Sequence, residues 1–224
     1  MNASNTNSIA DLTLDELRLV LAPEIAAAAA FDGWSDAALE HAAAANGVDI
    51  DVARLVFPGG SMEMIEAWID TIDVAMEAEH SLESLADLKI RDRIRTLVIA
   101  RLKAVTGMEE SLRRAQAVMA MPQNAPKALA MGWRSADKMW RLAGDNATDY
   151  NHYTKRAMLA GIYAATLAVF IDDESEGRAE THAFLDRRID GVMKIEKAKA
   201  RLLNSDRDHF SVSRFLGRLR YPAK

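Results

Sequence analysis

Four ionisable residues in the second half of the chain have a spacing that could support chemistry. They stand at i, i+4, i+7 and i+11, and they are Asp145, Asp149, His152 and Arg156. On a helix this spacing places all four on one face. The segment that follows, 157–171, contains no charged side chain. A polar face beside an apolar segment is compatible with a metal site, an acid–base site or a surface that docks another protein.

The metal alternative depends on carboxylate–histidine pairs at i, i+3 spacing, which are typical of di-iron helical bundles. The chain has two such pairs, Asp149 with His152 and Glu77 with His80. A di-iron site also needs a carboxylate from each of two partner helices, and no residue of the sequence is marked out for that role. Acidic residues are common where a helix begins because they bind free backbone N–H groups. We therefore expect no metal site.

Other catalytic signatures are missing from the sequence. It has no P-loop, no G-x-G-x-x-G turn and no G-x-S-x-G nucleophile elbow. Because it has no cysteine, it has neither a disulfide framework nor a thiolate zinc site. We expect no catalytic residues, no cofactor and no enzymatic activity.

The apolar segment 157–171 predicts a helix that is buried on all sides, because it has no polar face. It is too short to span a bilayer, which takes about 20 residues. A seam of small residues runs along it: Ala157, Ala160, Gly161, Ala164 and Ala168. This seam either admits a neighbouring helix or leaves a cavity for an apolar ligand. In the second case the lipid-binding residues would be Met158, Leu159, Gly161, Ile162, Ala165 and Val169.

The end of the chain, 205–224, combines basic residues with apolar residues at helical spacing. Its acidic residues are Asp206 and Asp208. A helix of this kind binds the surface of an anionic membrane, but an ordinary C-terminal helix packed on the protein has the same pattern. The expected membrane-binding residues are Phe210, Val212, Arg214, Phe215, Leu216, Arg218 and Leu219.

The composition predicts an all-α protein. Half of the 224 residues are hydrophobic, alanine is abundant, and there are only five prolines. We expect helices at residues 13–30, 35–46, 49–56, 62–79, 85–105, 108–120, 125–142, 146–171, 177–203 and 208–219. The expected parts are a disordered N-terminus (1–10), a helix-turn-helix-like head (11–60), a helical ligand-binding and dimerisation domain (61–204) and the basic helix (205–224). The fifth helix should have a basic outer face that includes Arg93, Arg101 and Lys103.

Three short helices before a long one resemble the DNA-binding head of a TetR-type regulator. In such a head the second helix of the motif enters the major groove and depends on basic contacts with phosphate. Here that helix reads "DIDVARLVF" and carries Asp49 and Asp51 with Arg54 as its single base. Because two carboxylates would repel the phosphates, we expect no nucleic-acid partner. A TetR-like regulator with a hydrophobic ligand pocket is the alternative function.

One long segment has a more specific likeness. Residues 137–163, "DKMWRLAGDNATDYNHYTKRAMLAGIY", closely resemble the signature of the Coq-nine family, the lipid-binding accessory proteins of ubiquinone biosynthesis. The core of this signature is W-x-x-A-G-D-x-x-T-D, from residue 140 to residue 149. The likeness continues through "FLDRRIDGVMKI" (184–195) and is weaker over 31–60.

The resemblance implies a TetR-like fold that does not regulate transcription. It also implies a homodimer, an internal cavity for isoprenoid lipid and a C-terminal amphipathic helix that meets the membrane. The implied partner is the demethoxyubiquinone hydroxylase, to which the family presents a quinone intermediate. Asp149 and Tyr153 correspond by position to the family's docking patch. His152 departs from the tryptophan of many relatives.

We therefore predict a non-enzymatic protein that binds a polyprenyl quinone intermediate or a phospholipid. It would present the quinone to the hydroxylase at a membrane surface. The predicted partner-binding residues are Asp145, Asp149, His152, Tyr153 and Arg156. The predicted location is the cytoplasm of a bacterium, at the inner membrane.

Overall fold

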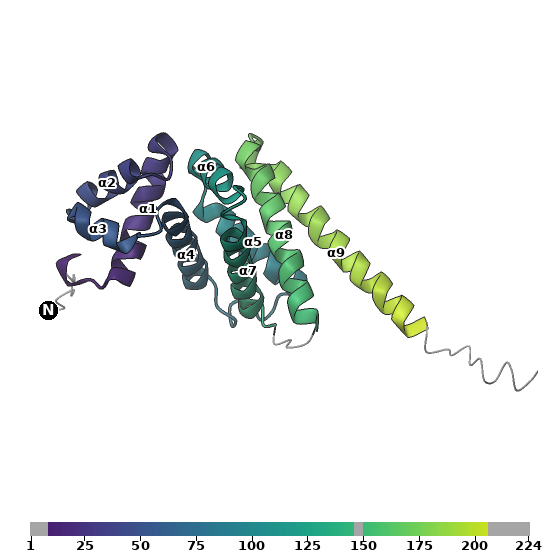
Figure 1. Ribbon diagram of the computed structural model, residues 1–224. Helices are drawn as coiled ribbons and strands as arrows, with labels where there is room; N and C mark the ends of the chain where they lie inside the picture. The colour runs from purple at the N-terminus through teal and green to yellow at the C-terminus, as the bar shows by residue number, and fades with distance from the viewer. Residues whose placement is uncertain (1–8, 146–149, 206–224) are drawn as a thin grey trace, which may run out of the picture. The chain divides into compact units, whose positions relative to one another are not determined.

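The computed structural model describes residues 9–145 and 150–205, and every regular element in these ranges is a helix (Figure 1). The α-helices are α1 (Leu14–Asp32), α2 (Asp36–Ala45), α3 (Ile50–Val56), α4 (Ser61–Glu79), α5 (Ile90–Ala104), α6 (Glu109–Met119), α7 (Ala125–Leu142), α8 (Tyr150–Asp172) and α9 (Ala179–Ser205). Two short 3-10 helices are η1 (Ile9–Asp11), where disorder was expected, and η2 (Glu176–Arg178). The predicted all-α class is confirmed. The expected tail helix and its seven membrane-binding residues lie outside the described residues.

Helix α1 begins at a capping box formed by Thr13 and Glu16. The Glu16 N–H donates to Thr13 Oγ1 at 3.3 Å, and the Thr13 N–H donates to Glu16 Oε2 at 2.9 Å. These bonds satisfy N–H groups that have no partner within the first turn. The start of α1 is therefore fixed by local sequence.

Helix α5 begins at Ile90, five residues later than the apolar pattern predicts. Before it, Ser81 and Ser84 bind each other's backbone. The Ser81 N–H donates to Ser84 Oγ at 2.9 Å, and the Ser84 N–H donates to Ser81 Oγ at 3.1 Å. Bonds of this kind compete with helical hydrogen bonds, so residues 82–87 form turns instead.

The chain divides into two compact units, residues 1–185 and 186–224. In the first unit, α1 packs against α2, α3, α4 and α6, and α4 packs against α5 and α7 (Figure 1). Trp34 contributes to this packing: its ring lies 5.3 Å from that of Trp68, and its Nε1 donates to Ser111 O at 3.0 Å. Helix α7 packs against α8. Helix α8 carries all six predicted lipid-binding residues and three of the five predicted partner-binding residues.

Arg101 does not lie on an exposed basic face of α5, so that expectation is wrong. Its side chain is buried and forms an ion pair with Asp73, which is buried on α4. It also donates to Ser135 Oγ on α7 at 3.1 Å, and its guanidinium lies 4.9 Å from the ring centre of Tyr163 on α8. A guanidinium enters the core only with such partners, and these partners come from three other helices.

Helix α3, the would-be recognition helix, keeps its acidic character in the folded protein. Asp49 accepts a hydrogen bond from the Asp51 N–H at 2.8 Å and so caps the helix. The side chain of Asp51 is exposed. Arg54 pairs with Glu40 at 3.0 Å and with Asp51 at 3.3 Å, so its charge is already matched by carboxylates.

Candidate functional site

The signature segment begins with the end of helix α7. The Asp145 N–H donates to Trp140 O at 2.9 Å, and the Gly144 N–H donates to Arg141 O at 3.0 Å. Gly144 has a φ of 88°, in the left-handed region. These three features define a Schellman motif, which ends a helix and satisfies its last carbonyls. The A-G-D core of the signature is therefore a helix stop that directs the chain toward α8.

Arg93 of α5 holds this helix stop in place. Its Nη1 donates to Ala143 O and its Nε to Leu88 O, both at 2.9 Å. A Cβ atom on Gly144 would lie 3.1 Å from Arg93 Nη1 and 3.2 Å from Leu82 Cδ1. Glycine is thus favoured here both by its backbone conformation and by the close approach of these side chains.

A cluster of opposite charges follows the helix stop. Lys155 Nζ lies 2.6 Å from Asp145 Oδ1, and Arg156 Nη1 lies 3.1 Å from Asp145 Oδ2. Arg156 Nε also donates to Asp137 Oδ1 of α7 at 2.6 Å. Burial by itself would raise the pKa of Asp145, but the hydrogen bonds from Lys155 and Arg156 lower it below its ordinary value. Asp145 therefore stays ionised at neutral pH, and the cluster joins α7, the α7–α8 connection and α8.

Three aromatic side chains lie on the same two helices. The ring of Trp133 on α7 lies 6.0 Å from that of Tyr153 and 6.5 Å from that of His152. The His152 and Tyr153 rings are 5.1 Å apart and nearly perpendicular. Tyr153 is 62% exposed. We call Trp133, His152 and Tyr153 the aromatic patch. An exposed aromatic side chain such as that of Tyr153 is typical of protein interfaces.

The predicted stripe of partner-binding residues does not lie on one helix. Helix α8 begins at Tyr150, so Asp145 precedes it and reaches the cluster from the connection. Arg156 is 2% exposed and cannot form a large contact with a partner. Tyr153 is exposed, His152 is half-buried, and Asp149 lies outside the described residues. The partner-binding role of all five stays a prediction.

Sequence reasoning overlooked three residues of this site: Trp133, Asp137 and Lys155. The segment quoted for the resemblance begins at Asp137 and contains Lys155, which was the available signal for both. Trp133 lies four residues before Asp137, one turn away on the same face of α7. Only the fold brings it to Tyr153.

Helix α8 is not buried on all sides, so that expectation is wrong. Leu159, Tyr163 and Phe170 face the core and are buried. The residues of the small-residue seam lie at the surface. Ala160 is half-buried, and the other four are exposed: Ala157, Gly161, Ala164 and Ala168. A Cβ atom on Gly161 would meet no atom within 4 Å. The seam therefore faces outward instead of enclosing an unfilled space.

The six predicted lipid-binding residues also differ in how far they are exposed. Leu159 is buried and Gly161 is exposed, and the other four are half-buried: Met158, Ile162, Ala165 and Val169. By length and composition, residues 152–172 form a helix that could cross a membrane. This corrects the expectation, drawn from 157–171 alone, that the segment is too short to do so. The core helix of a soluble protein meets the same criterion. Lipid binding by these residues stays a prediction.

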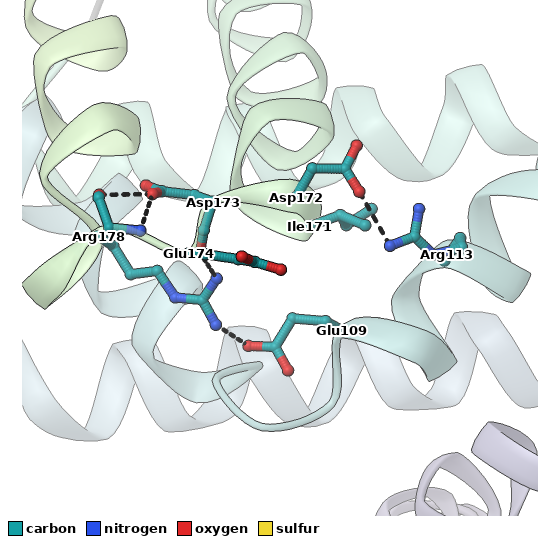
Figure 2. A pocket seen from close by; sticks show the side chains of 8 residues that line it. Glu109, Arg113, Ile171, Asp172, Asp173, Glu174 and Arg178 are labelled. Carbon is teal, nitrogen blue, oxygen red and sulfur yellow. Dashed lines mark hydrogen bonds and ion pairs between the residues drawn. The ribbon is translucent and has the colours of Figure 1, made fainter.

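A polar pocket of about 530 Å³ lies where α8 ends, beside the start of α6 (Figure 2). Asp173 accepts hydrogen bonds from the N–H groups of Ser175 and Thr181 at 2.9 Å and 2.8 Å. Burial would raise the pKa of Asp173, but these hydrogen bonds hold it far below its ordinary range. Arg178 pairs with Glu109 and also donates to Asp173 O. These contacts stabilise the corner after α8.

A second pocket, of about 520 Å³, lies between α4 and α7. It is lined by Glu77, Leu82, Arg134, Asp137, Lys138, Arg141 and Leu142. Neither pocket is lined by any of the predicted lipid-binding residues. Over residues 9–145 and 150–205, no group of three or more acidic, histidine or cysteine side chains is arranged to hold a metal ion.

The helical architecture defines the class of this protein as TetR-like. A solved TetR transcriptional regulator from Nitrosomonas europaea superposes with a TM-score of 0.62 at 25% identity, covering 77% of this chain and 95% of that one. Within this class the chain is a homologue of the COQ9 proteins. Residues 125–196 match the COQ9 family model, which confirms the resemblance to the Coq-nine family.

Two curated relatives show the extent of the match. The mitochondrial ubiquinone biosynthesis protein COQ9 of Rattus norvegicus is 33% identical over 170 residues, which are 73% of this chain and 54% of the relative. That of Homo sapiens is 31% identical over 170 residues, 73% of this chain and 53% of the relative. This chain thus spans about half the length of the curated relatives it matches. Because these relatives are mitochondrial, the predicted location at a bacterial inner membrane is wrong.

Proposed function

We propose that this protein is a non-enzymatic accessory protein of ubiquinone biosynthesis. It binds an isoprenoid quinone intermediate and presents it to the demethoxyubiquinone hydroxylase. The observation that carries the proposal is the course of the signature segment, which forms the helix stop, the charge cluster and two residues of the aromatic patch before it continues into the apolar part of α8. The proposed docking surface and the proposed lipid-binding surface would therefore adjoin on α8.

The apolar part of α8 supports the lipid half of the proposal. No charged side chain occurs from Ala157 to Ile171, and the exposed side of this segment consists of small residues flanked by half-buried larger ones. An isoprenoid tail would bury this surface, and so would a second copy of the chain. We place the lipid along the strip formed by Met158, Ile162, Ala165 and Val169. The proposed homodimer and the proposed membrane contact of the basic tail complete this arrangement.

Lipid content is the direct test of the proposal. Native mass spectrometry of the purified protein should detect bound isoprenoid or phospholipid, and protein stripped of lipid should take up a demethoxyubiquinone analogue. Ile162→Asp places a charge in the proposed strip and should reduce uptake at least tenfold, because a buried unpaired carboxylate is costly. Val74→Asp is the control, since Val74 is a half-exposed aliphatic residue of α4. Wild-type protein that stays lipid-free and takes up no quinone would refute the lipid half.

Tyr153→Ala tests the protein half. We expect the change to weaken association with the hydroxylase roughly tenfold or more, because exposed aromatic residues often dominate interface energy. The melting temperature should hardly change, since Tyr153 is 62% exposed. Phe31→Ala is the matched control, because Phe31 is 84% exposed on α1. Equal affinities of both variants and the wild type, measured by surface plasmon resonance, would contradict the assignment.

Transcriptional regulation is the second candidate, because a solved protein of similar fold is a TetR regulator. The chemistry of α3 argues against it. Its single base, Arg54, is paired with two carboxylates, and the side chain of Asp51 is 86% exposed. Salt-dependent binding to duplex DNA in a gel-shift assay would favour regulation over the accessory role.

A further inference from the structure

Two kinds of contact join α7 to α8, and they involve neighbouring residues. The aromatic contact is between Trp133 on α7 and the His152–Tyr153 pair on α8. The ionic contact is between Asp137 on α7 and Arg156 on α8. Asp137 stands four residues after Trp133, and Arg156 stands four residues after His152. On each helix the ionic residue is therefore one turn from the aromatic one.

The geometry points to Asp137 as a positioning residue of the docking surface, acting through Arg156 on the aromatic patch. The inference deepens the proposed function and rests on it, because the aromatic patch matters only if it meets a partner. Arg156 was predicted to contact the partner. Under this inference its buried side chain instead positions the aromatic patch. Neither ionic residue needs to contact the hydroxylase.

Arg156 is suited to this role by its contacts. It is buried, and its Nε lies 2.6 Å from Asp137 Oδ1. Its Nη1 lies 3.1 Å both from Asp145 Oδ2 and from His152 O. One planar guanidinium thus binds a carboxylate of α7, a carboxylate of the α7–α8 connection and the backbone of the residue beside Tyr153. Such a rigid set of donors fixes direction as well as distance.

The aromatic contact fixes the relative positions of the three rings less tightly than the ion pair does. Aromatic rings accept a range of distances and tilts with little change in energy, and Tyr153 is mostly exposed. A buried arginine between two carboxylates has far fewer acceptable geometries, because any carboxylate that it leaves loses its charge-assisted hydrogen bond. The ring positions should therefore follow the ion pair.

The variant Asp137→Asn tests the inference with little change in shape. It removes the charge but keeps an oxygen that can accept from Arg156 Nε, and Arg156 retains Asp145, so the protein should fold. We expect about tenfold weaker association with the hydroxylase. Nuclear Overhauser contacts between the Trp133 and Tyr153 rings should be lost in the free protein. Arg141→Met is the matched control: it removes the other partner of Asp137, a mostly exposed arginine 2.8 Å away, and should change neither result.

A double-mutant cycle separates positioning from general destabilisation. If Asp137 acts through the aromatic patch, Asp137→Asn combined with Tyr153→Ala should bind no more weakly than Tyr153→Ala alone. Additive losses, or ring contacts that persist in Asp137→Asn, would overturn the inference. If the wild-type protein does not bind the hydroxylase, the proposed function fails. The ring contacts in the free protein then decide by themselves whether Asp137 positions the patch.

Discussion

Replacing Arg101 with methionine should lower the free energy of unfolding by about 3–5 kcal/mol, because the change leaves the Asp73 carboxylate buried without its main partner. The two side chains are only 1% and 2% exposed. The variant also loses the hydrogen bond to Ser135 and the stacking on Tyr163. Lys138 Nζ, 3.5 Å from Asp73 Oδ2, remains as a second cation and favours the lower end of the range. Urea denaturation followed by circular dichroism measures the loss.

Lys103→Met is the control for this prediction, because Lys103 lies on the same helix as Arg101 but forms an exposed ion pair with Glu79 of α4. Lys103 is 72% exposed and lies 3.3 Å from Glu79, so its loss should cost less than about 1 kcal/mol. Replacing both core partners, with Arg101→Met and Asp73→Leu, should recover much of the stability, since no unpaired charge is left. If Arg101→Met and Lys103→Met lower the free energy of unfolding by similar amounts, the buried ion pair contributes no more to stability than the exposed one.

Gly144→Ala should cost about 2–5 kcal/mol of stability and also weaken association with the proposed hydroxylase partner. A side chain at a φ of 88° costs about 1–2 kcal/mol. The new Cβ would also press on Arg93 and Leu82 at 3.1 and 3.2 Å, and crowding of this kind costs about 1–3 kcal/mol. Because Asp145 is the next residue, any relief of this strain displaces the charge cluster.

The matched control is Gly47→Ala. Gly47 also has a positive φ, 64°, but a Cβ there would meet no atom within 4 Å. Its loss of stability should be about 1–2 kcal/mol, from backbone strain alone. The difference between the two variants isolates the close approach of Arg93 and Leu82. If Gly47→Ala proves as destabilising as Gly144→Ala, glycine is favoured at position 144 only by the backbone conformation and not by the close approach of Arg93 and Leu82.

Local features of the sequence were sufficient to predict the fold class and most helices. The capping box at Thr13 and the Asp49 cap are interactions between residues only a few positions apart in the sequence. Such interactions are the same in any fold, so they can be read without one. The start of α5 was predicted five residues too early. The apolar pattern extends into a segment where the hydroxyls of two serines accept hydrogen bonds from the backbone in place of helical carbonyls.

The site depended on partners that are distant in sequence. Periodicity shows which residues share a face of a helix, but it does not show what lies opposite that face. Arg101 therefore looked exposed until Asp73 and Tyr163 were placed around it. Asp145 was assigned to a helical stripe, although a helix stop places it before α8. Short-range patterns were enough to predict most helices and the family. Which charges are buried, and which residues surround Tyr153, depends on contacts between helices and therefore follows only from the fold.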